Sequence, residues 1–177
     1  MRGSKKSDTD LPRNLTPEEK RRRTFERAVK LLASKSRSVT ELRERLLESR
    51  SANKTDVEAV ISRLKEYGYL DDERFALSYA SLKVKQRPIG RRRLERDLKF
   101  KKVDDSVADK ALELVYAETS EEELIDRAIE KRVRLKGRPT NRLEAKSVFD
   151  HLLRQGFPFE LVSEKVRAAS REQLDED

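Results

Sequence analysis

The sequence predicts an all-α protein, an elongated array of three tandem three-helix repeats of the helix-turn-helix type. Ser or Thr followed three residues later by Glu precedes several apolar stripes of helical spacing. No run of ~4–8 residues rich in β-branched and aromatic side chains indicates a strand. A long, a short and a medium helix recur in that order with a period of about 50 residues, which is typical of a helical repeat protein.

The first repeat is expected to span residues 17–70, after a disordered polar tail over 1–16. A hydroxyl can cap each of its helices by accepting a hydrogen bond from an orphan backbone N–H. The capping pairs are Thr16–Glu19, Ser38–Glu41 and Thr55–Glu58, and a fourth, Ser120–Glu123, starts the third repeat. The expected helices of the first repeat cover about 17–36, 39–49 and 56–67. Gly68 then ends the last of them as a left-handed cap.

The second and third repeats are expected over residues 71–118 and 119–171, followed by an acidic tail over 172–177. An Arg-Pro pair, at Pro88 and again at Pro139, ends the first helix of each, since proline lacks a backbone donor. On the first helix of the second repeat, the residues expected to face inward are Phe75, Tyr79 and Leu82. The middle helices of the three repeats align at Leu42/Leu46, Leu94/Leu98 and Val148/Leu152. Coincidence is the alternative reading, because any helical protein contains apolar pairs at this spacing.

The composition argues against a thick core, a membrane span and an enzyme. Charged residues make up 43% of the chain and hydrophobic residues 35%, which favours thin helical packing. No cysteine is present, which excludes disulfides and thiolate metal sites and permits residence in the cytoplasm. No window approaches ~18 consecutive apolar residues. The single histidine, His151, is expected to cap or pack near the end of its helix, so catalysis, metals and cofactors are not expected.

Residues 83–102 hold the whole positive surplus of the chain. This window has ten Lys or Arg against two acids, and the net charge of the chain is +8. Positive charge concentrated in this way attracts polyanions. The alternative interpretation is a helical face that is only solvated. The cations that project away from the apolar stripe of its helix are Arg92, Arg96 and Lys99. The cations that flank them are Arg87, Arg91, Arg93, Lys101 and Lys102. Gly90 allows a close backbone approach, and the first-turn N–H groups of this helix are expected to favour anions.

A second basic stretch lies at the equivalent place in the third repeat, over residues 131–146. Its candidate binding residues are Lys131, Arg132, Arg134, Lys136, Arg138 and Arg142. Two basic junctions at matching positions could line one surface. We expect non-specific contacts to phosphates, because no helix has the Asn, Gln and Arg pattern of base readout. Most aromatic residues fall in apolar stripes, so few are expected to be available for base stacking.

Residues 67–76, Tyr-Gly-Tyr-Leu-Asp-Asp-Glu-Arg-Phe-Ala, closely resemble the signature of the RecX family of bacterial regulatory proteins. The signature residues are Tyr67, Gly68, Tyr69, Leu70, Asp71, Asp72, Phe75 and Ala76. Pro88-Ile89-Gly90 and Gln155-Gly156-Phe157 also fit, and the resemblance covers about residues 24–170. One position departs from the family, which commonly has glycine where Lys102 stands. A lysine there would be strained if the turn requires a positive φ.

The resemblance implies a modulator of the RecA recombinase that is not an enzyme. It implies a protein that binds in the groove of the RecA–single-stranded DNA filament and opposes its extension, strand exchange and ATPase activity. The implied roles are in DNA repair, DNA recombination and the SOS response, in the cytoplasm. The expected partners are the RecA filament and single-stranded DNA, with no cofactor, no membrane and a monomeric free state. The alternative is a free-standing, non-specific nucleic-acid-binding protein that acts without a recombinase.

Overall fold

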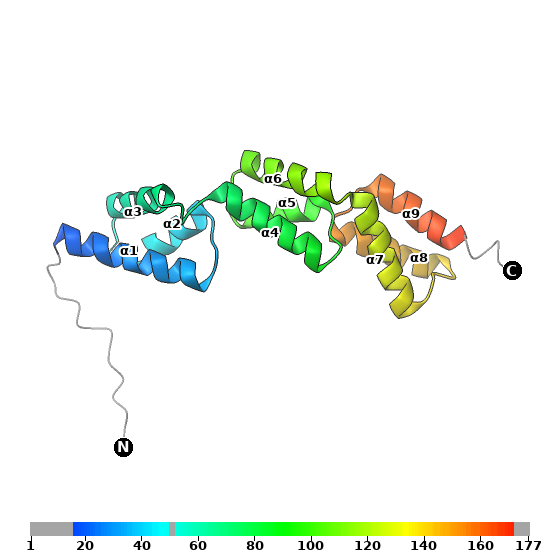
Figure 1. Ribbon diagram of the computed structural model, residues 1–177. Coiled ribbons are helices and arrows are strands. Elements are labelled where there is room, and N and C mark those ends of the chain that lie inside the picture. Colours follow the sequence, from blue (N-terminus) through cyan, green and yellow to red (C-terminus); the bar gives the residue numbers. More distant parts are fainter. Residues whose placement is uncertain (1–15, 50–51, 172–177) are drawn as a thin grey trace, which may run out of the picture. The chain divides into compact units, whose positions relative to one another are not determined.

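The structure is a computed structural model that describes residues 16–49 and 52–171, and these residues form nine α-helices and no strand (Figure 1). The all-α prediction is therefore confirmed. The helices are α1 (Pro17–Ser34), α2 (Val39–Leu47), α3 (Lys54–Glu66), α4 (Asp72–Gln86), α5 (Arg91–Phe100), α6 (Asp105–Glu118), α7 (Glu121–Lys136), α8 (Arg142–Gln155) and α9 (Phe159–Arg171). They follow the predicted triplets of helices. Of the polar tail expected over residues 1–16, residues 1–15 lie outside the described residues, as does the acidic tail over 172–177, while Thr16 caps α1.

A capping box starts α1 as predicted. Thr16 Oγ1 accepts a hydrogen bond from Glu19 N at 3.2 Å, and the Glu19 carboxylate accepts one from Thr16 N at 2.9 Å. The predicted hydroxyl caps are also present at α2 and α7, where Ser38 and Ser120 accept from the backbone N–H three residues later. Each cap satisfies a backbone donor that has no partner inside the helix.

The cap predicted for α3 at Thr55 is wrong, because the helix begins before that residue. Asn53 Oδ1 accepts a hydrogen bond from Asp56 N at 2.7 Å. Asparagine caps helices at least as well as threonine, so the earlier residue takes the position and Thr55 lies inside the helix. The Glu58 carboxylate instead accepts two hydrogen bonds from Arg43 of α2, at 2.7 and 3.1 Å.

The described residues fall into two compact units that divide between Leu70 and Asp71. The first unit comprises α1, α2 and α3 around one apolar core. Its buried residues are Ala28, Val39, Leu42, Leu46, Val57, Val60, Ile61, Leu64 and Leu70. The second unit comprises α4 to α9 around a second core, so the second and third triplets pack together. This shared core holds the predicted stripes of α5 and α8.

In the second unit α4 lies beside α6, as the green helices of Figure 1 show. Ala76, Ala80 and Val84 form the buried face of α4, and two buried alanines of α6 belong to the same core. Small side chains on both helices allow their backbones to approach closely. The expectation that Leu82 faces inward is wrong, since it is 54% exposed. Phe75 and Tyr79 are half-buried and stacked, with ring centroids 6.0 Å apart.

The second and third triplets meet where α5 begins and α8 ends. Gly90 N donates a hydrogen bond to Gln155 O at 2.9 Å. Gly156 follows with a φ of +92°, in the left-handed region that favours glycine. Phe157 then turns inward and is buried in the shared core. The close approach that Gly90 allows is therefore made by the protein's own backbone and not by a ligand.

None of the helices in the described part of the chain is both long enough and apolar enough to cross a membrane.

Candidate nucleic-acid interface

A cleft of about 240 Å³ lies between the second and third triplets, within the second unit. This junction cleft is lined by Arg87, Pro88, Ala128, Lys131, Arg132, Leu135, His151 and Gln155. It brings together three of the predicted binding cations from two basic stretches that are far apart in sequence. No acid is among these lining residues. A concave site lined by charges of one sign concentrates the electric field and attracts counter-ions, here anions.

Two helices, α4 and α7, place the cations of the junction cleft. Arg87 is the C-cap of α4, where its backbone N–H donates to Lys83 O at 3.1 Å and Pro88 prevents the helix from continuing. Arg132 extends from α7 and its Nη2 donates to Ser147 Oγ of α8 at 3.1 Å. This hydrogen bond holds the guanidinium at the cleft, whereas Lys131 beside it is exposed.

The only histidine of the chain, His151, is half-buried and lines the junction cleft. Burial lowers its pKa below the ordinary value of 6.5, and the positive charges of Arg132, Arg154 and Lys136 lower it further. The imidazole is therefore neutral at pH 7. A bound anion would oppose these cations and favour the protonated ring, so the charge of His151 depends on what occupies the cleft.

A second cationic surface is the exposed side of α5, which we name the α5 face and define as Arg92, Arg96 and Lys99. All three side chains are exposed, and they lie opposite the fully buried Leu94 and Leu98. The predicted orientation of this helix is confirmed. Its N-cap is Gly90, which has no side chain to offer the first turn.

The flanking cations of α5 are engaged within the protein. Arg91 N donates to Glu121 Oε1 at 2.7 Å, and the Arg91 guanidinium lies 4.0 Å from Asp109. Arg93 Nη1 donates to Arg154 O at 3.1 Å. The expected preference for an external anion at the start of α5 is therefore wrong at Arg91. The carboxylate of Glu121, from α7, already takes that backbone donor.

Three cations of the second basic stretch lie at the ends of helices. Arg134 and Lys136 are exposed in the last turn of α7, and Arg142 is exposed at the start of α8. None of the three is among the residues that line the junction cleft. They add positive charge on the two helices that form one side of it.

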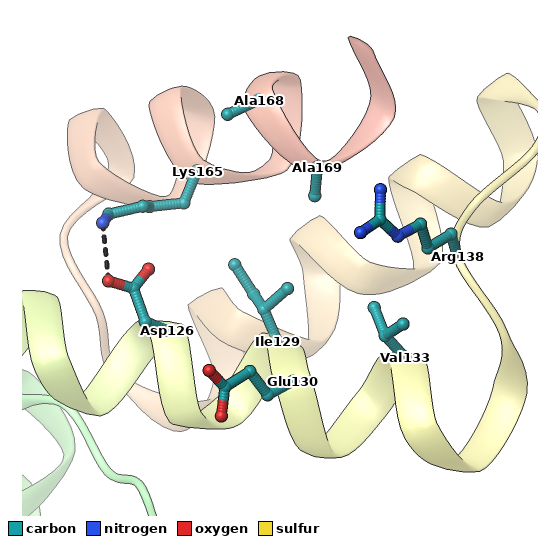
Figure 2. Close-up of a pocket in the computed structure, with 8 residues that line it drawn as sticks. All are labelled: Asp126, Ile129, Glu130, Val133, Arg138, Lys165, Ala168 and Ala169. Carbon is teal, nitrogen blue, oxygen red and sulfur yellow. Dashed lines mark hydrogen bonds and ion pairs between the residues drawn. The ribbon is translucent and has the colours of Figure 1, made fainter. Parts of the chain in front are cut away.

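Arg138 lies in a different groove, between α7 and α9, with its guanidinium directed toward Ala169 (Figure 2). This groove has a volume of about 440 Å³ and also contains Glu130 and an ion pair. Lys165 Nζ donates to Asp126 Oδ2 at 2.8 Å, and this hydrogen bond raises the pKa of Lys165. Because acids and bases alternate here, the groove does not favour anions as the junction cleft does.

The signature phrase contributes to both units by different means. Gly68 adopts a φ of +68° and ends α3 as predicted, and Leu70 is buried in the first core. Asp71 caps α4 by accepting a hydrogen bond from Arg74 N at 3.0 Å. Asp72 begins the helix and Ala76 is fully buried on its inner face. These residues shape turns and helix starts.

Tyr67 and Tyr69 are exposed on the first unit, where their rings meet edge to face at 6.2 Å between centroids. With Phe25 and Arg63 they line an apolar groove of about 830 Å³. The Arg63 guanidinium lies 5.2 Å from the ring centroid of Phe25 and 5.4 Å from that of Tyr67. Cations at this distance from a ring face are attracted to it.

Most aromatic side chains are buried or half-buried, as expected, and few are exposed. Among the described residues the large exposed aromatics are Tyr67, Tyr69, Phe100 and Phe159. Phe100 is the most exposed of them, at 83%. A signal for it was present in the sequence, because a helical projection places Phe100 well away from the stripe of Leu94 and Leu98.

The turn after α5 contains the predicted strained residue. Lys102 has a φ of +58° and is the only residue other than glycine with positive φ in the described part of the chain. Its N–H donates to Lys99 O at 2.9 Å, and the following Val103 is buried. The turn therefore has the left-handed geometry that the glycine of the family would adopt without strain.

No group of three or more His, Cys, Asp or Glu that could hold a metal ion occurs among the described residues.

Comparison with known proteins places the chain in a family. A family model described as RecX, second three-helix domain, matches residues 71–112. Regulatory protein RecX of Treponema pallidum (strain Nichols) is 40% identical over 104 residues, which are 59% of this chain and 63% of that protein. Regulatory protein RecX of Chlorobium limicola is 33% identical over 141 residues, covering 78% of this chain and 84% of the relative.

A crystal structure of RecX from Lactobacillus salivarius superimposes with a TM-score of 0.74 over 87% of this chain and 98% of its own, at 18% identity, which shows a common fold. The match spans 63% of the Treponema protein, and 57% of the one from Bacillus licheniformis, which is longer than this chain. The Chlorobium protein, by contrast, is matched over most of its length. On this similarity, together with the signature phrase and the shared fold, the chain belongs to the RecX family of regulatory proteins.

Proposed function

We propose that this protein binds the RecA–single-stranded DNA filament and inhibits its extension, ATPase activity and recombinase activity. It would act in the cytoplasm as a monomer and modulate DNA recombination, DNA repair and the SOS response. Membership of the RecX family supports the choice of RecA as the partner. The observation that carries the proposal is the junction cleft, which gathers cations without an acid in its lining.

The chemistry of the junction cleft suits the phosphates of single-stranded DNA. Arg87 and Arg132 each offer a planar fork of donors that fits phosphate oxygens, and Lys131 adds a point charge. Contacts of this kind are independent of sequence, as a regulator of filaments on any DNA requires. They also release counter-ions, so binding should weaken steeply as salt is added. The α5 face would extend the contacts beyond the cleft.

A free-standing nucleic-acid-binding protein is the alternative function, and the same cleft would serve it. The two differ in whether RecA is needed for the effect. A protein that only coats DNA must reach amounts comparable to the DNA sites. A regulator of a growing filament can act well below the amount of RecA, because one bound molecule blocks the addition of many.

The test is the rate of ATP hydrolysis by RecA on single-stranded DNA as this protein is added below stoichiometric amounts. Inhibition is expected, and it should be lost when the cleft cations are reversed to glutamate. The cleft variant is Arg87→Glu, Lys131→Glu and Arg132→Glu. A matched control reverses three exposed cations of the first unit, Arg23→Glu, Lys30→Glu and Lys65→Glu.

The control variant has the same net charge as the cleft variant and should retain most of the inhibition. Equal loss in both would show that only net charge matters and would remove the role of the cleft. Absence of inhibition at every ratio, with DNA binding intact, would favour the free-standing alternative. Direct binding to filaments formed with and without DNA separates contacts to RecA from contacts to the strand.

A further inference from the structure

Phe100, the last residue of α5, is a large apolar side chain left in water. It is 83% exposed. A helical projection places it on the same side of α5 as Arg96, one turn earlier, so the ring extends the α5 face. The other exposed residues of this helix are Arg92, Glu95, Arg96 and Lys99, which are all charged. The ring therefore stands alone among charges, three of them positive.

A second unfavourable feature lies two residues later. Lys102 is exposed and has a φ of +58°, a conformation that costs a non-glycine residue free energy. The segment 99–102 reads Lys-Phe-Lys-Lys, so the strained turn presents cations on both sides of the ring. Glycine at position 102 would relieve this strain. A strained residue that is kept in the native state is a reason to look for a function nearby.

An exposed aromatic ring beside cations is the arrangement by which proteins hold single-stranded nucleic acid. The ring stacks on a base, because every base has a π face, and the cations contact the adjacent phosphates. A duplex does not offer such a base, since its bases are stacked on each other. A protein–protein interaction site is instead typically marked by a larger contiguous apolar patch. The exposed residues of α5 around Phe100 are charged.

We propose that Phe100 stacks on a nucleobase of single-stranded nucleic acid, while Arg96 and Lys99 contact the flanking phosphates. This inference rests on the proposed function and adds to it a contact with bases. Phosphate contacts alone hold any polyanion, whereas a stacked base restricts the ligand to an unpaired strand. The α5 face would then distinguish single-stranded from double-stranded nucleic acid without reading its sequence.

The chain contains no tryptophan, so a single introduced indole reports on one place. The variant Phe100→Trp should fold as the natural protein does, because position 100 is exposed. Its fluorescence should be quenched when a short oligothymidylate is added. An oligomer of the same length that carries abasic sites keeps the phosphates and lacks the bases, so it should bind without quenching. The matched control is Leu114→Trp, at an exposed apolar position of α6 in the same unit.

A second pair of variants measures the contribution of the ring to affinity. Phe100→Leu keeps an apolar side chain and removes the π face, and should weaken binding to the oligothymidylate roughly tenfold. Phe100→Tyr should bind as the natural protein does. Both should keep the salt dependence of the natural protein, because neither removes a phosphate contact.

Several outcomes would overturn the inference. If the oligomer binds without quenching the indole at position 100, or quenches the indole at position 114 equally, Phe100 does not stack on a base. The proposed function would remain intact. Lower inhibition of RecA by Phe100→Leu with unchanged affinity for DNA would assign the ring to a protein partner. Failure of the natural protein to bind single-stranded DNA at low salt would overturn the phosphate contacts as well. Inhibition of RecA, measured separately, shows which of the two proposals has failed.

Discussion

Gly90 and Gly156 lie in one backbone contact, in which neither position has room for a side chain. A Cβ atom on Gly90 would lie 2.3 Å from the carbonyl carbon of Gly156, and one on Gly156 would lie 2.4 Å from Arg93 N. This backbone contact joins the start of α5 to the end of α8. It also positions the residues next to it, Pro88 and Gln155, which line the junction cleft.

The variant Gly90→Ala is expected to destabilise the protein by about 1–3 kcal/mol, as overpacking of a close contact does. Its binding to oligothymidylate should also fall, because the junction cleft must open to accept the methyl group. Chemical denaturation and a binding titration measure the two effects. The control is Gly68→Ala, where nothing lies within 4 Å of the added Cβ and only the positive φ opposes the change. Unchanged DNA binding by Gly90→Ala would show that the contact does not shape the cleft.

The variant Lys102→Gly is expected to stabilise the protein. Relief of the left-handed conformation at φ +58° contributes ~1–2 kcal/mol. The greater entropy of glycine in the unfolded chain removes ~0.5–1 kcal/mol of this. A net gain of ~0.5–1 kcal/mol should appear as a higher midpoint of denaturation. Lys102→Ala keeps the Cβ and should give no gain, so equal stability of the Gly and Ala variants would contradict the strain.

Charge reversal of the α5 face at Arg92, Arg96 and Lys99 should weaken binding to single-stranded DNA or to the filament. Each phosphate contact that is lost lowers the slope of log affinity against log salt by about 0.7 for a single strand. Folding should change by no more than about 0.5 kcal/mol, since the three side chains are exposed. Titrations at several salt concentrations measure the slope. If affinity and slope both stay the same, the α5 face is only a solvated surface.

The ring protons of His151, the single histidine, report on the junction cleft by NMR. Its pKa in the free protein should lie below 6.5, because of burial and the positive charges of Arg132, Arg154 and Lys136. Oligothymidylate should raise this pKa, since phosphate favours the protonated ring. By linkage, binding should then strengthen as the pH falls from the bound pKa toward the free one, and His151→Gln should abolish that change. An unchanged pKa at saturating DNA would exclude phosphate from the cleft.

The stability of the free protein should respond to pH in the opposite sense. The folded-state pKa of His151 is lowered, so the unfolded chain binds a proton more readily near pH 6.5. The folded state therefore loses stability as the pH falls through about 6.5, and the loss ends below the folded-state pKa. Comparing thermal denaturation of the natural protein with His151→Gln across this range isolates the contribution of this residue.

Features that depend on neighbouring residues were predictable from sequence. The helices, the hydroxyl caps at Thr16, Ser38 and Ser120, and the exposed face of α5 all depend on contacts within about four residues along the chain. The same reasoning was wrong where two neighbouring residues could cap the same helix, or where two faces of one helix could be buried. At α3 the cap is Asn53. On α4 a buried face of small residues replaced the stripe expected to include Leu82.

The candidate site was only partly predictable. Both basic stretches were identified, but their cations separate into several environments, and those of the α5 face and of the ends of α7 and α8 are exposed. Arg87 joins Lys131 and Arg132 in the junction cleft, Arg138 lies between α7 and α9, and Arg91 is engaged within the protein through its backbone and its guanidinium. A basic stretch predicts charge, and it does not predict which cation faces a cleft, because that depends on how helices distant in sequence pack.

The sequence by itself determined that this protein is helical, where its positive charge is concentrated and which family signature it carries, because these follow from composition and from local periodicity. The tertiary structure alone decided that Glu121 caps α5, that Gly90 meets Gly156, and that a cleft lined with cations and without acids forms beside that contact. These are contacts between residues 30 or more positions apart. These contacts depend on how whole helices pack against one another, and the local sequence pattern describes only one of the two helices in each contact.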